Sequence, residues 1–292
     1  MATQLQMPTM PSTRISFRNI LVATDFSRYS DNAFEYALFL AQQYGSKVYA
    51  AHVFPTYALP RHAEMTEAKS KLEKLVARLE KQEIAGEAVM GEGSIVSFLQ
   101  NFSTEKNIDL IVAGTHGCAG IKRLVLGSVA EEIVRSADCP ILTVGPKVPR
   151  TKLGSIDFGR IMYATDFSPE SANAVPYVIS LAEKFKAFTY LVHVLPKGTT
   201  GSKQAKEQMT AYFTKELQKL VPLDWDNWST PLAIVEEGDA VKEIEALAKG
   251  READLIVLGA KKASATASHF RAGLSYTLMA HAKCPVLTLH TR

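Results

Sequence analysis

The chain is poor in cysteine. Its 292 residues include three, Cys118, Cys139 and Cys284, and no two of them form a C-x-x-C pair. Thiols this few and this widely spaced argue against a disulfide framework and against a zinc site built from paired cysteines. We therefore expect a reducing, intracellular setting and a cytoplasmic location.

An excess of charge and long apolar runs are missing as well. The 33 Lys and Arg nearly balance the 30 Asp and Glu, which leaves a net charge of +3. With no basic run, this balance predicts no nucleic-acid partner. No segment approaches the ~20 apolar residues of a membrane span, so we expect no membrane partner. The opening MATQLQMPTMPSTR lacks the apolar core of a signal peptide, and we expect residues 1–15 to form a flexible tail.

What the sequence does contain is two copies of one unit. Residues 19–55, NILVATDFSRYSDNAFEYALFLAQQYGSKVYAAHVFP, return at 160–196 as RIMYATDFSPESANAVPYVISLAEKFKAFTYLVHVLP without a gap. Further on, DLIVAG at 109–114 returns as DLIVLG at 254–259. Such recurrence indicates a duplicated domain, and the chain length also suits two domains.

Each copy alternates short apolar strands with amphipathic helices. In the first copy a strand at 20–23 precedes a helix that we expect to start near Ser27 and to stop near Gly45. The apolar run at 110–113 is typical of a strand buried on both faces. This alternation predicts an α/β fold, with a parallel sheet covered by helices on both faces.

The chain divides into two domains of ordinary size. We expect the first at 16–146 and the second at 159–292, because the two copies fall within these ranges. The stretch between them, 147–158, lacks periodicity and lies in a segment rich in Gly and Pro, so we interpret it as the linker.

One stretch, GTHGCAGIKRLVLGS, lies between the fourth strand of the first copy and a helix. Its glycines include Gly114, Gly117 and Gly127, and Ser128 follows directly. Ligands of parallel sheets bind beyond the carboxyl ends of the strands, where a helix N-terminus offers free N–H groups to a phosphate. Glycine lets the backbone approach such a ligand closely. A structural alternative stays open, because Ser128 and Glu131 form the S-x-x-E pattern of a capping box.

The spacing G-x2-G-x9-G-[ST] resembles the nucleotide-binding signature of the universal stress protein family. The segments ILVATDFS, AHVFP, DLIVAGTHG and GSVAEEIVRSADCPILTV are similar to the same family, and the likeness covers nearly the whole chain twice. It implies two tandem Rossmann-like domains, related to the adenine-nucleotide α-hydrolases, each with a five-stranded parallel sheet. It also implies an intrachain pseudo-dimer, joined by docking of the last strands, that binds ATP with Mg²⁺.

The resemblance also implies site residues. Asp25 would approach the ribose and a phosphate-bound Mg²⁺, and Val53 would meet adenine through its backbone. The phosphates would be held by the glycine turn and the helix start, at Gly114, Thr115, His116, Gly117, Gly127, Ser128 and Val129.

Several of these residues also have structural explanations. Asp25 and its counterpart Asp166 both precede a helix, so a turn or capping role accounts for both. His52 and His193 lie near strand ends in the two copies, and we interpret them as hydrogen-bonded structural histidines. His116 can be a phosphate ligand or an exposed loop residue.

The second copy departs from the glycine pattern. Lys262 stands where the first copy has Gly117, and Ala272 and Gly273 replace Gly127 and Ser128. A side chain at the first of these positions removes the close backbone approach. The sequence therefore predicts one competent nucleotide site, in the first domain.

These observations favour an ATP-binding stress or regulatory protein with an unknown protein partner. Near the motif we find no second carboxylate and no arginine finger suited to hydrolysis, so we do not expect an enzyme. Two alternatives remain: a slow ATPase or adenylyl-handling enzyme of a related α/β family, and a scaffold that binds no nucleotide. The sequence leaves open whether the tandem chain pairs again as a homodimer.

Overall fold

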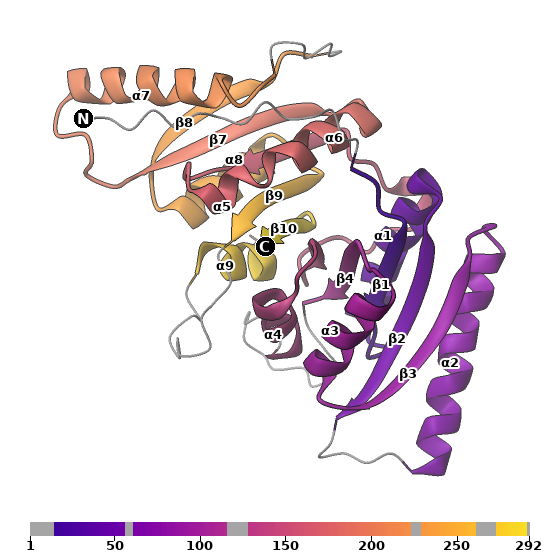
Figure 1. The fold of residues 1–292 in the computed structure, drawn as a ribbon. Helices are drawn as coiled ribbons and strands as arrows, with labels where there is room; N and C mark the ends of the chain where they lie inside the picture. The colour runs from indigo at the N-terminus through magenta and orange to yellow at the C-terminus, as the bar shows by residue number, and fades with distance from the viewer. Residues whose placement is uncertain (1–14, 56–60, 116–127, 223–228, 261–272, 291–292) are drawn as a thin grey trace.

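The computed structural model describes residues 15–55, 61–115, 128–222, 229–260 and 273–290 (Figure 1). Strands and helices alternate through the first repeat as the sequence predicts: β1 (Asn19–Ala23), α1 (Arg28–Tyr44), β2 (Lys47–Pro55), α2 (His62–Glu80), β3 (Gly86–Gly93), α3 (Ile95–Glu105), β4 (Leu110–Gly114), α4 (Ser128–Ser136) and β5 (Ile141–Val144).

The second repeat follows the same order after a short 3-10 turn. Its elements are η1 (Leu153–Ser155), β6 (Arg160–Ala164), α5 (Pro169–Ala172), α6 (Val175–Phe185), β7 (Phe188–Pro196), α7 (Lys203–Gln218), β8 (Leu232–Gly238), α8 (Ala240–Gly250), β9 (Leu255–Ala260), α9 (Leu274–His281) and β10 (Val286–His290).

All ten strands form one sheet, in the order β3-β2-β1-β4-β5-β10-β9-β6-β7-β8. Strands within each repeat are parallel, as expected, whereas β5 and β10 pair antiparallel with Leu142 opposite Leu287. The side-chain hydroxyl of Thr143 also donates to the carbonyl of Val286 across this junction, at 3.2 Å. The docking of the last strands thus joins two expected five-stranded sheets into a single mixed one.

Helices cover both faces of the sheet, which explains its apolar strands. Ile20 and Val22 of β1 belong to one core cluster with residues of α1 and α2, while Leu21 faces the other cluster with residues of α3 and α4. Successive strand residues point to opposite faces, so a strand covered on both faces is apolar at most of its positions, and a buried polar residue such as Thr143 of β5 needs a hydrogen-bond partner.

The segment that we expected to be a linker packs into the core shared by the repeats. Phe158 is 1% exposed, and its ring lies 5.3 Å from that of Phe39 on α1 and 5.3 Å from that of Phe185 on α6. Asn32 of α1 also accepts the N–H of Thr151. The aromatic contacts add to the strand junction in holding the two repeats together.

The first helix of each repeat differs in one respect. Helix α1 runs without a break, with Ser27 as its N-cap and Gly45 in the left-handed conformation at its C-cap, in agreement with the sequence prediction. The second repeat has two helices, α5 and α6, in its place. Pro176 lacks the N–H that would bond to the carbonyl four residues earlier, so the helix is interrupted just before it.

Candidate functional site

The loop between β1 and α1 lies at the carboxyl edge of the sheet and is held by its own polar groups. Asp25 accepts the N–H of Ser27 at 3.0 Å, and Thr24 Oγ1 accepts the N–H of Phe26 at 3.0 Å. Phe26 has φ of 59°, a left-handed conformation unusual for a bulky residue. Asp25 therefore has the turn role that the sequence left open, and its half-buried carboxylate lies at the edge where ligands of parallel sheets bind.

His52 of β2 supports this loop from the neighbouring strand. Its Nδ1 lies 2.8 Å from the carbonyl oxygen of Thr24, and its ring centroid lies 4.5 Å from that of Phe26. This is the hydrogen-bonded structural histidine that the sequence predicted.

Gly114 is required by packing. A Cβ at this position would lie 2.8 Å from the carbonyl carbon of Tyr29 and 2.9 Å from the backbone nitrogen of Ser30. These atoms belong to the first turn of α1, which lies directly on the end of β4. The first glycine of the motif thus lets the helix approach the strand.

Val53 offers its backbone at the same edge. Ala51 is the last residue of β2 that pairs with β1, and its carbonyl accepts the N–H of Thr24 at 2.9 Å. Backbone groups of alternate residues point to the same side of a strand. Val53 therefore turns its N–H and C=O toward the side where β1 has already ended.

The remaining predicted site residues belong to the glycine stretch. Thr115 is fully buried, and its N–H donates to the carbonyl of Val144 at 3.1 Å. Ser128 and Val129 begin α4, as the sequence predicted for the helix start. His116, Gly117 and Gly127 lie outside the described residues.

The second repeat builds the same loop at its own carboxyl edge. Asp166 accepts the N–H of Ser168 at 3.0 Å, Phe167 has φ of 60°, and His193 Nδ1 lies 2.8 Å from the carbonyl of Thr165. Burial raises the pKa of Asp166, but hydrogen bonds from Ser168 and Ser171 outweigh it and leave the pKa below its usual value. The shared D-F-S sequence is thus explained by the fold of both repeats.

The two repeats differ above this loop. In the second, Phe213 of α7 stacks on His193 with ring centroids 4.4 Å apart and lies 5.6 Å from Phe167. In the first, Lys71 of α2 places its ammonium 5.2 Å above the ring of Phe26, where it also forms an ion pair with Glu67 at 2.7 Å. One site is covered by an aromatic ring and the other carries a cation.

Neither of these two side chains is identified as part of the site by the sequence alone. Helical spacing predicts that Phe213 faces the core, but nothing in the sequence places it on His193. Lys71 lies outside the glycine motif, on a helix with two other lysines, Lys69 and Lys74.

In the second repeat, the loop after β7 is held against β8 by hydrogen bonds. The carboxylate of Glu237 on β8 accepts the N–H of Gly198 at 2.9 Å, and it also accepts the N–H and the hydroxyl of Thr200. The corresponding loop of the first repeat includes residues 56–60, which are outside the described part of the chain.

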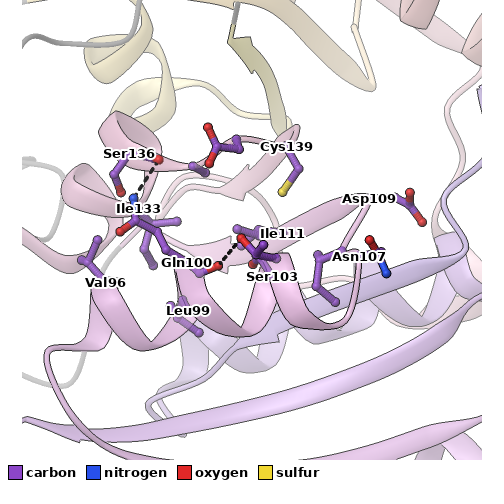
Figure 2. Close-up of a pocket in the computed structure, with 14 residues that line it drawn as sticks. Val96, Leu99, Gln100, Ser103, Asn107, Asp109, Ile111, Ile133, Ser136 and Cys139 are labelled. Carbon is purple, nitrogen blue, oxygen red and sulfur yellow. Dashed lines mark hydrogen bonds between the residues drawn. The ribbon is translucent and has the colours of Figure 1, made fainter. Parts of the chain in front are cut away.

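A separate cavity lies at the opposite edge of the first repeat, between α3 and α4 (Figure 2). It has a volume of about 330 Å³, and its lining includes Asp109 just before β4 and Cys139 just before β5. None of the predicted site residues lines it.

The fold thus defines a class: an α/β chain of two repeats, each with the same loop structure after its first strand, joined through one sheet. The model of the universal stress protein family matches residues 16–145 and again 157–290. The chain belongs to the universal stress protein family. No helix among the described residues has the length and apolar character to cross a membrane.

Individual proteins and solved structures are also similar to this chain. A universal stress protein of Methanocaldococcus jannaschii is 32% identical over 139 residues, which are 44% of this chain and 82% of that protein. The crystal structure of a universal stress protein from Archaeoglobus fulgidus matches 94% of this chain and 97% of its own, with a TM-score of 0.70 and 21% identity. A universal stress protein in complex with cAMP matches 44% of this chain and 98% of its own, with a TM-score of 0.37 and 24% identity.

Proposed function

We propose that this chain is an adenine-nucleotide-binding regulatory protein that binds ATP at one site, in the first repeat. The observation that most supports this is the complete glycine pattern of that repeat, which starts at the end of β4 and finishes at the start of α4. The first N–H groups of a helix have no partner within the helix and form a ready site for phosphate. Asp25, Val53 and Thr115 lie at the same edge of the sheet.

The proposal assigns the second repeat no nucleotide site. Phe213 covers His193 there, and Lys262 and Ala272 stand in place of two motif glycines. Lys71 gives the first repeat a cation above its β1–α1 loop, where it can offset the charge of a polyphosphate.

Mg²⁺ enters the proposal as part of the nucleotide complex, where it neutralises phosphate charge. The described residues include no group of three or more His, Cys, Asp and Glu that could hold a metal. Mg²⁺ bound to a nucleotide takes most of its ligands from phosphates and water and needs one or two carboxylates. Asp25 fits that requirement as a single half-buried carboxylate.

Regulation would follow from preferential binding. A ligand that binds one conformation more tightly shifts the population toward it and raises its stability. We place this activity in the cytoplasm, in agreement with the free thiols of Cys139 and Cys284.

Isothermal titration of the full chain with Mg-ATP tests the proposal. We expect one site per chain. Gly117→Lys, which places the second repeat's residue in the first, should lower the affinity at least tenfold, whereas the matched change Lys262→Gly should leave it unchanged. Two equal sites, or loss of binding on Lys262→Gly alone, would contradict the proposal. Gly114 is unsuitable for this test, because a Cβ there collides with α1.

Catalysis is tested separately. We propose that the protein binds ATP without turning it over, so product should not accumulate beyond one equivalent per chain during long incubation with Mg-ATP. Accumulation over many turnovers that Gly117→Lys abolishes would instead identify a slow ATPase.

A further inference from the structure

The cavity between α3 and α4 (Figure 2) is lined by Asp109 and Cys139, which precede β4 and β5, so it lies at the amino ends of these strands. The proposed nucleotide site lies at the carboxyl ends. Its inner wall is apolar and consists of buried side chains from both helices and from the sheet, including Leu99, Ile111 and Ile133. Its rim is polar, and Gln100 Nε2 bridges to the carbonyl of Ser136 at 2.9 Å. A few polar groups around an apolar wall are typical of small-molecule sites.

Ser103 contributes a hydroxyl to this cavity that has no partner. Its Oγ is buried and makes no hydrogen bond among the described residues. Two other hydroxyls of the same wall behave differently, since Thr104 donates to the carbonyl of Gln100 and Ser136 donates to that of Glu132. A buried polar group without a partner is unfavourable, so a ligand that supplies a hydrogen bond gains affinity when the Ser103 side chain rotates its hydroxyl toward the cavity.

The charged side chains at the rim of the cavity are all acidic. Asp109 and Asp138 both line the cavity, and its fourteen described lining residues include no Lys or Arg. One oxygen of Asp109 accepts the N–H groups of Arg18 and Asn19, and the carboxylate keeps its negative charge at the rim. Helices α3 and α4 also end beside it, at Glu105 and Ser136, and helix C-termini carry a partial negative charge.

The thiol of Cys139 lies beside the same two carboxylates. Burial is the main cause that raises its pKa to about 12, and the nearby carboxylates Asp109 and Asp138 raise it further. A negative field favours a cation and disfavours an anion.

We propose that this cavity binds a small amine with an apolar body. The body packs against Leu99, Ile111 and Ile133, and the ammonium lies toward the carboxylate rim and donates a hydrogen bond to Ser103 Oγ. The volume of about 330 Å³ suits a molecule with one ring.

The second repeat provides the control for this site. At the positions of Gln100 and Ser136 it has Glu245 and His281, and His281 Nδ1 lies 3.8 Å from Glu245 Oε1 across the groove between α8 and α9. The counterpart of Ser103 is Ala248. The residues of the second repeat can therefore be introduced into the first, where histidine at Ser136 fills the cavity and alanine at Ser103 removes the hydroxyl.

Titration of the full chain with benzylamine, benzyl alcohol and benzoate tests the inference. We expect benzylamine to bind at one site per chain, benzyl alcohol to bind more weakly and benzoate not to bind. Ser103→Ala should lower the benzylamine affinity about fivefold, through loss of one hydrogen bond. Ser136→His should lower it more than tenfold by filling the cavity.

Two results would overturn the inference: benzoate binding as well as benzylamine, or benzylamine affinity unchanged in Ser103→Ala. The second is decisive even if the histidine variant folds poorly, because alanine is the residue of the second repeat at this position. Affinity for Mg-ATP should be the same with and without benzylamine, so failure of this site and failure of the nucleotide site are separate outcomes.

Discussion

The carbonyl oxygen of Glu170 lies so close to Gly259 that a Cβ on the glycine would be 2.2 Å from it. Gly114 of the first repeat has the same relationship to α1, with a Cβ 2.8 Å from the carbonyl carbon of Tyr29. The helix after the first strand therefore lies against the end of the fourth strand in both repeats. The first motif glycine has a folding role that does not depend on a ligand.

Alanine at either glycine should destabilise the protein. We expect Gly114→Ala and Gly259→Ala each to lower the free energy of unfolding by about 1–3 kcal/mol, because backbone atoms must move to admit a methyl group. Urea unfolding followed by circular dichroism measures this. Gly154→Ala is the control, since no atom lies within 4 Å of a Cβ there. If Gly259→Ala proved neutral, the packing explanation would be wrong.

Phe213 should stabilise the second repeat, because its ring stacks on those of His193 and Phe167. We expect Phe213→Ala to lower the free energy of unfolding by about 1–2 kcal/mol, because it removes stacking on His193 and Phe167. The neighbouring Tyr212 is 59% exposed, so Tyr212→Ala should change the stability much less. Equal effects of the two substitutions, measured by urea unfolding, would show that the ring on His193 contributes little.

The sequence predicted most of the fold because its signals are local and occur twice. Ser27 and Gly45 mark the ends of α1, and the apolar strands indicate a sheet covered on both faces. The junction of β5 with β10 followed from the family resemblance. The break between α5 and α6 was missed, although Pro176 supplies a physical reason for it.

The candidate site was predicted less completely, because sequence spacing does not show what surrounds a residue. The motif identified Gly114 without revealing that α1 occupies the space beside it. The position of Phe213 over His193 and the cavity beside Ser103 depend on contacts between separate elements. Such contacts follow from tertiary packing, which periodicity alone does not determine.

Glu237 should hold the loop after β7 through its charge. Its pKa is lowered chiefly because the hydroxyl of Thr200 donates to the carboxylate. A lowered pKa means that this contribution is present above the ordinary pKa of 4.5 and is lost as the pH falls through the lower value of the folded state.

Glu237→Gln should therefore speed amide hydrogen exchange at Gly198 and Thr200 by roughly five- to tenfold near neutral pH. Glu236→Gln, on the preceding residue, is the matched control and should leave both amides protected. Acidification well below pH 4 should speed exchange at these two amides as Glu237→Gln does, once the rates are corrected for the pH dependence of intrinsic exchange. Unchanged protection in the variant would show that the loop is held by other contacts.

Cys139 and Cys284 should be inert in the folded protein. Burial is the main cause that raises both pKa values to about 12, so near pH 8 only about one thiol in ten thousand is ionised. Iodoacetamide should leave both unmodified until guanidinium unfolds the chain, as mass spectrometry would show.

The unfolded state loses these protons near the ordinary pKa of 9, so stability should fall as the pH rises from about 9 toward 12. Cys284→Ala should make that fall shallower, and rapid native alkylation of Cys139, which is half-buried, would contradict its raised pKa.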